Sequence, residues 1–152
     1  EMARKPYVVH GVLYSNSLWK HDATAENCSH SYMKHARWAE DTDASTTAHG
    51  EQIFRLQCAS CHTRDGYRSV AWRTRQWTPL FGFKWFSTMA DLGVMPPFYG
   101  DANDRAALVS YLMTLQGKSV TPQSVIDEAR KAGVDIDLSN CPSSPKSNKG
   151  VQ

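Results

Sequence analysis

The chain has 152 residues, 41% of them hydrophobic, and a formal net charge of +2 that sets 17 basic residues against 15 acidic ones. Such a chain supports one modest hydrophobic core and fits one domain better than two. The near-balanced charge excludes the basic footprint of a nucleic-acid-binding protein and a polybasic block for a membrane surface. No apolar run reaches the roughly 20 residues that a membrane-spanning helix needs, so no transmembrane segment is expected in this chain.

Residues 1–43 are aromatic and polar and show no sustained helical or strand periodicity. We expect them to form an irregular N-terminal extension. The chain begins at Glu1 and lacks the basic start and apolar segment of a secretory leader, which indicates a mature protein or an excised segment. Residues 44–118 contain two amphipathic patterns and most of the motifs, so the functional domain is predicted there.

The pattern C-x-x-C-H occurs at residues 58–62. In c-type haem attachment, two thiols at this spacing add across the porphyrin vinyl groups and the adjacent imidazole ligates the iron. Residues three apart share a face of a helical turn, so Cys58 and Cys61 can reach one ring edge while His62 turns toward the metal. A dithiol redox pair would need a βαβ context, and a zinc site a second close Cys or His pair. One covalent haem c with its iron is therefore predicted at Cys58, Cys61 and His62.

Met95 is the predicted sixth ligand of that iron. It lies in the segment Gly-Val-Met-Pro-Pro-Phe at residues 93–98, where two prolines favour an extended strap without a competing helix. Thioether ligation would favour the reduced iron and raise its potential relative to a second imidazole. Met89 and Met113 lie in helical patterns and are expected to fill the core. The sixth ligand could instead be one of five histidines that are individually more typical of surface or hydrogen-bonded sites: His10, His21, His30, His35 and His49.

Two amphipathic helices are predicted around the motif and the strap. Residues 48–57 place Gly50 and Phe54 near one face. Residues 101–116 have an acidic start and end at a glycine, with an apolar stripe of Ala107, Leu108, Tyr111, Leu112 and Leu115. A glycine four residues before an aromatic residue, opposite Tyr111, permits a close crossing of the two helices.

Residues 119–152 are predicted to contain one short helix and a polar tail. Thr121 is a capping residue, Pro122 suits the first helical position and Gly133 ends the pattern. Residues 138–152 are too polar to pack into a core.

The order G-x-x-x-F, C-x-x-C-H, M-P-P-F and Y-L resembles the class I c-type cytochromes and covers residues 44–118. The resemblance implies an all-α class I cytochrome c fold around one covalent haem, with irregular N- and C-terminal extensions. It also implies that His62 and Met95 are the axial ligands, and that the haem is attached outside the cytoplasm, in the periplasm or another extracytoplasmic space.

Residues 64–90, between the motif and the strap, interleave arginines with aromatic residues. This composition suits a haem pocket, because rings exclude water and Arg or Tyr can bind the propionates, although each arginine could instead cover surface. Tyr67 and Arg68 are the first candidates for binding the propionates. The resemblance further implies that the carbonyl of a proline, here Pro79, accepts a hydrogen bond from the far nitrogen of His62.

Cys28 and Cys141 lie outside the motif, one in each flank. In an oxidising compartment two spare thiols most simply pair, so a disulfide between them is predicted, with free or intermolecular thiols as the alternative. Residues 1–9 resemble the E-x-x-R-x-P-W stretch near the outer surface in the large subunit of cytochrome bd-type quinol oxidases. That resemblance implies a module associated with a membrane quinol-oxidising complex, and a chance match in a docking extension is the alternative.

These features predict an electron-transfer protein rather than an enzyme. Single electrons would pass through one haem c with His/Met ligation in a respiratory or related redox chain, to transient redox protein partners. The second hypothesis is a fixed haem subunit of a larger membrane respiratory complex, bound through residues 1–43 and 119–152. The third is a haem sensor or enzyme with an open sixth site. We expect no nucleic-acid partner.

Overall fold

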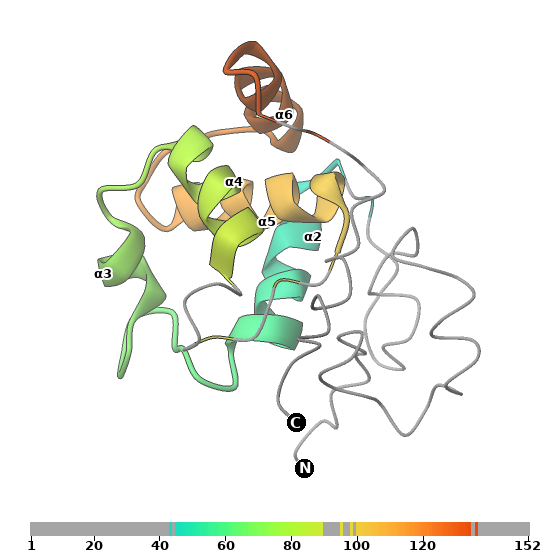
Figure 1. The fold of residues 1–152 in the computed structure, drawn as a ribbon. Helices are drawn as coiled ribbons and strands as arrows, with labels where there is room; N and C mark the ends of the chain where they lie inside the picture. The colour runs from blue at the N-terminus through green and yellow to red at the C-terminus, as the bar shows by residue number, and fades with distance from the viewer. Residues whose placement is uncertain are drawn as a thin grey trace, which may run out of the picture.

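All regular structure in the described part of the chain is helical. The computed structural model describes residues 43, 45–89, 95, 98, 100–134 and 136. The elements are α2 (Thr47–Ile53), the π-helix η2 (Phe54–Cys58), α3 (Val70–Thr74), α4 (Pro79–Thr88), α5 (Ala102–Thr114) and α6 (Pro122–Lys131) (Figure 1). The prediction of an all-α fold is confirmed. None of the described helices is long and apolar enough to cross a membrane.

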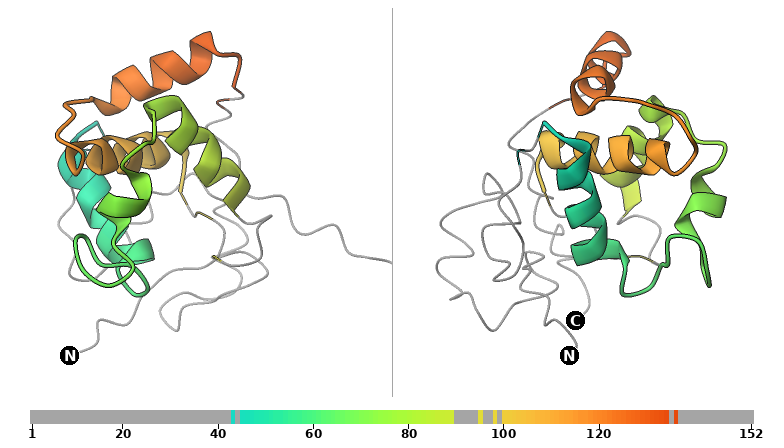
Figure 2. Two further views of the ribbon diagram at one scale, coloured as in Figure 1. Left: turned by 90° about the vertical axis from the view of Figure 1, so that its left-hand side faces the viewer. Right: turned by 180° about the vertical axis from the view of Figure 1, so that it is seen from behind.

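Helix α5 is the central element, and α2, α3, α4 and α6 all pack against it (Figures 1 and 2). It begins with a capping box, because the Asp101 carboxylate accepts from Asp104 N at 2.8 Å and the Asp104 carboxylate accepts from Asp101 N at 3.2 Å. The helix lies within the predicted range 101–116. Its buried residues extend beyond the predicted stripe, because helices cover it on several sides.

Helix α2 crosses α5 at Gly50, where the two backbones touch. One turn further along, the ring centroids of Phe54 and Tyr111 lie 5.6 Å apart. The predicted close crossing is therefore confirmed. After Ile53 the helix widens into η2, in which Ala59 N donates to Phe54 O at 2.9 Å, five residues back. The haem motif thus follows directly from the helix crossing.

Helix α4 is apolar on nearly every face. Phe83 and Phe86 are buried against the core. On the outer side, Phe81 is 46% exposed and stacks on Trp85 at 5.9 Å between ring centroids. Trp77 lies 5.2 Å from Phe81 and 5.7 Å from Trp85, so the three rings form one cluster.

Helix α6 confirms the helix predicted after residue 120. The hydroxyl of Thr121 accepts from Ser124 N at 3.2 Å, Pro122 opens the helix, and Gly133 follows it with φ +66. Helix α6 lies over α5 and α4 (Figure 2) and packs on both. Its buried residues are Pro122, Val125, Ile126 and Ala129, and the last three belong to the same apolar cluster as residues of α5 and α4.

Two predictions about methionines are confirmed, since Met89 and Met113 are buried in the core, at 8% and 0% exposure. The predicted extension up to residue 42, the tail at 138–152 and both partners of the predicted Cys28–Cys141 disulfide lie outside the described residues.

Candidate haem-binding site

The C-x-x-C-H motif forms a tight turn at the end of η2. The carbonyl oxygen of Cys58 accepts hydrogen bonds from the amides of Cys61 and His62, at 3.1 and 2.9 Å. Cys58 is half-buried, whereas Cys61 is exposed. Both cysteines therefore lie within one turn of backbone, as attachment to two vinyl groups of one porphyrin requires.

The imidazole of His62 is bound on one side by the backbone. Its Nδ1 lies 3.0 Å from the carbonyl oxygen of Arg68, so Nδ1–H donates and Nε2 is the nitrogen available to a metal. The expectation that Pro79 supplies this carbonyl is wrong. Pro79 is the first residue of α4, and a carbonyl in the first turn of a helix points along the helix axis into the helical hydrogen bonds.

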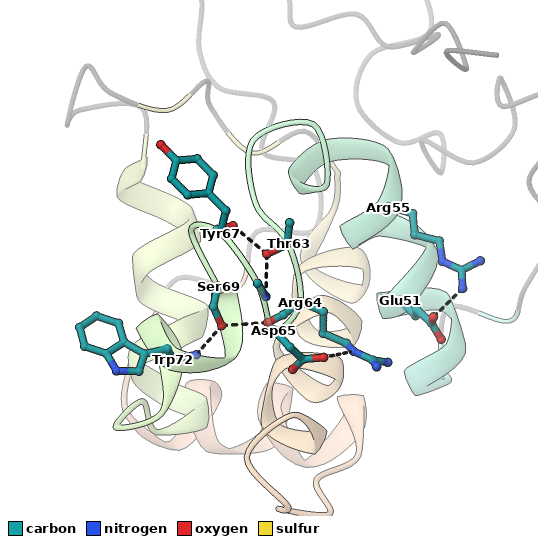
Figure 3. A network of polar contacts seen from close by, with 9 residues as sticks. Glu51, Arg55, Thr63, Arg64, Asp65, Tyr67, Ser69 and Trp72 are labelled. Atoms are coloured by element: carbon teal, nitrogen blue, oxygen red, sulfur yellow. Dashed lines mark hydrogen bonds and ion pairs between the residues drawn. The ribbon is translucent and has the colours of Figure 1, made fainter.

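The segment between His62 and α3 is folded by short polar contacts (Figure 3). Ser69 Oγ donates to the carbonyl of Arg64 at 3.0 Å and accepts from Trp72 N at 3.1 Å, which caps α3. The hydroxyl of Thr63 closes the other end of the loop through the backbone of residues 66 and 67. Sequence reasoning missed this loop, although Asp-Gly between a Thr and a Ser is a recognisable turn signal.

Two arginines near the motif form ion pairs on the surface. Arg55 binds Glu51 at 2.7 Å and Arg64 binds Asp65 at 2.8 Å (Figure 3). The hydrogen bond and charge of Asp65 raise the pKa of Arg64 above its ordinary value. Both pairs are exposed, so each contributes little to stability.

Tyr67 and Arg68, the predicted propionate partners, both lie on this loop with exposed side chains. The Arg68 guanidinium lies over the Tyr67 ring, 5.5 Å from its centroid. The structure therefore brings these two side chains together, and the backbone carbonyl of Arg68 contacts the His62 imidazole. Their binding to propionates stays a prediction.

Met95 is half-buried and packs against the apolar core cluster. The prolines of the predicted strap, at positions 96 and 97, lie outside the described residues. Among the histidines that could replace Met95, His49 is 1% exposed and its Nε2 binds Asp104 Oδ1 at 2.6 Å, so it serves the α2–α5 crossing. The remaining four histidines of that set lie outside the described residues: His10, His21, His30 and His35.

The chemistry of these donors fits a haem c. A hydrogen-bonded imidazole directly follows two cysteines in one turn, and a thioether lies against an apolar cluster. Within the described residues no group of three or more His, Cys, Asp or Glu could hold a metal ion by itself. Haem iron needs only axial ligands from the protein, since the porphyrin supplies four nitrogens.

Comparison with known proteins agrees with this interpretation of the donors. Residues 45–112 match the family model described as cytochrome C oxidase, cbb3-type, subunit III. No curated protein and no solved structure matches the chain. The matched range runs from the residue before the α2 cap into α5, and it includes the C-x-x-C-H turn, the Thr63–Ser69 loop, Met95 and the helix crossing.

Proposed function

We propose that His62 and Met95 ligate the iron of the one covalent haem that residues 45–112, a c-type cytochrome domain, bind for electron transfer. The bound haem supplies a one-electron ferric/ferrous couple. The observation that carries the proposal is the 3.0 Å contact between His62 Nδ1 and Arg68 O, which leaves Nε2 as the ligating atom. Met95 supports it as a half-buried thioether against the core.

Four residues would hold the haem. Cys58 and Cys61 would bind the porphyrin through thioether bonds, which would keep the haem on the domain through every redox cycle. His62 would supply its imidazole and Met95 its sulfur as ligands of the iron. Because Met95 packs against apolar residues, its surroundings would favour the less charged, reduced iron.

The test of the axial ligands is a redox titration with absorption spectra of the wild type and of Met95→Ala. We expect Met95→Ala to lose the long-wavelength thioether-to-iron band and to have a lower potential, because a stabiliser of the ferrous iron is gone. Met113→Leu is the matched control, since Met113 fills the core at 0% exposure. A Met95→Ala protein with the wild-type spectrum and potential would overturn the assignment.

We further propose that the domain works as a fixed haem subunit of a membrane respiratory complex on the extracytoplasmic side. The description of the matching family, a subunit of an oxidase, supports this over a freely diffusing carrier. Size-exclusion chromatography of mildly solubilised native membranes tests the proposal. We expect the haem-stained chain in a large complex, and a lone peak near 17.0 kDa would favour the free carrier.

A further inference from the structure

We propose that Thr63 is a positioning residue for His62: its hydroxyl folds the loop over residues 63–69 so that the Arg68 carbonyl orients and polarises the imidazole. The inference rests on the proposed ligation of iron by His62. It assigns a role to a side chain that does not contact the haem ligands' donor atoms and acts only through the backbone of its loop.

The Thr63 hydroxyl both donates and accepts a hydrogen bond within the loop. Oγ1 donates to the carbonyl of Tyr67 at 2.7 Å and accepts from Gly66 N at 2.9 Å (Figure 3). The Thr63 backbone is bound as well, since its carbonyl accepts from Val70 N at 2.9 Å. One residue thus joins the start of the loop to its middle and to the start of α3.

Arg68 shows that the loop imposes its conformation. It is the single non-glycine residue with a positive φ in the described part of the chain, at φ 53. Such backbone is unfavourable for an L-residue and persists where surrounding contacts hold it. The Tyr67 carbonyl that precedes it accepts from the Thr63 hydroxyl at 2.7 Å and from Thr63 N at 3.4 Å. The hydroxyl makes the shorter of these two bonds, and both hold the peptide from which Arg68 turns back toward His62.

The consequence is electronic as well as geometric. A carbonyl that accepts from Nδ1–H fixes the tautomer and the ring orientation, and it makes Nε2 a stronger donor to a metal. A stronger donor stabilises ferric iron and lowers the potential. Loss of the Thr63 hydroxyl should therefore loosen the Arg68 carbonyl, weaken the donor and raise the potential.

The experiment compares full-length holoproteins carrying Thr63→Val, which keeps the shape and removes the hydroxyl, and Thr63→Ser, which keeps the hydroxyl. Two quantities are measured: the midpoint potential, and the solvent exchange rate of the His62 Nδ1 proton by NMR of the reduced protein. For Thr63→Val we expect a higher potential and exchange faster by about fivefold or more, as for the loss of one hydrogen bond. Thr63→Ser should match the wild type.

A general Thr-to-Val effect is controlled by Thr88→Val, because Thr88 is exposed and its hydroxyl bonds only within α4. The proposal would be overturned if Thr63→Val had the exchange rate and midpoint potential of the wild type. It would also be overturned if Thr63→Ser changed both quantities as much as Thr63→Val does. If Thr63→Val yields no holoprotein, Thr63→Ala removes the same hydroxyl and should shift both quantities in the same direction. An unshifted Thr63→Ala would then overturn the proposal.

These outcomes are separate from those that test the iron ligands. Failure of the Met95 assignment appears as an unchanged spectrum in Met95→Ala. Failure of His62 ligation appears as an Nδ1 proton with no paramagnetic shift in the oxidised wild type. The Thr63 variants leave both signatures in place and change only the exchange rate and the potential.

Discussion

Gly50 of α2 lies so close to the carbonyl oxygen of Ala107 in α5 that no side chain fits between the two backbones. The aromatic contact between Phe54 and Tyr111 lies on the same side, one turn along the chain. Since η2 and the C-x-x-C-H turn continue directly from α2, this crossing sets where the cysteines and His62 stand relative to α5.

Replacement of Gly50 by alanine tests the crossing. A Cβ there would overlap the Ala107 carbonyl, which is backbone and cannot rotate away, so the helices must separate. We expect Gly50→Ala to lower the free energy of unfolding by about 3 kcal/mol or more, measured by urea titration of the holoprotein. Ala48→Gly, at an exposed site of the same helix, should cost only about 1 kcal/mol. A Gly50→Ala protein as stable as the wild type would contradict the close packing.

His49 and Asp104 form a buried link across the same helices. His49 Nε2 lies 2.6 Å from Asp104 Oδ1, and the two side chains are 1% and 2% exposed. We expect His49→Ala to cost about 3 kcal/mol, because it leaves a buried carboxylate without this donor. In a double-mutant cycle with Asp104→Ala, the double variant should lose clearly less stability than the sum of the losses in the two single variants. Fully additive losses would show that the pair does not interact.

Helices α2, α5 and α6 could be predicted from their sequence patterns, whereas α3 and α4, which lie within residues 64–90, were not among the predicted helices. Thr121, Pro122 and Gly133 bracket α6, and the spacing of Gly50 and Phe54 against Tyr111 predicts the crossing. The π-helix before the motif was not predictable, since a one-residue widening leaves no mark on the pattern of apolar residues.

The site was predictable only in its covalent part. Cys58, Cys61 and His62 follow from one motif, whereas the acceptor for His62 is a backbone atom whose position depends on the fold of a loop. Arg68 was predicted to bind a propionate through its guanidinium, whereas the contact with His62 is made by its backbone carbonyl. A proline carbonyl inherited from a family resemblance was wrong, because in this chain that proline starts a helix.

Alkaline pH should weaken the fold through Tyr111. Burial raises the pKa of Tyr111 above its ordinary value, and the charge of Glu51 adds to the shift. The unfolded chain therefore releases the phenolic proton at a lower pH than the native protein does. Stability is unaffected below the ordinary value of about 10 and falls as pH rises through it toward the raised native pKa.

Tyr111→Phe keeps the ring that contacts Phe54 and removes the titrating group. In thermal melts between about pH 9 and pH 11, we expect the wild type to lose stability more steeply with pH than Tyr111→Phe. Only the wild type has a phenol at this position, and its ionisation in the unfolded chain stabilises the unfolded state. Their difference should be constant below about pH 8, where neither state of the tyrosine ionises. Parallel curves at every pH would contradict a raised pKa.

Helix α6 lies beyond the range of the family match and beyond the predicted domain end at residue 118, yet Val125 and Ala129 are fully buried in the common core. We propose that the haem domain extends through α6. Ala129→Asp would place a charge in that core, and we expect a loss of about 3 kcal/mol or more. Arg130→Ala, one residue along and exposed, should change stability by less than about 0.5 kcal/mol. If Ala129→Asp has the melting temperature of the wild type and an intact haem spectrum, then α6 is not part of the haem domain and the domain ends before this helix.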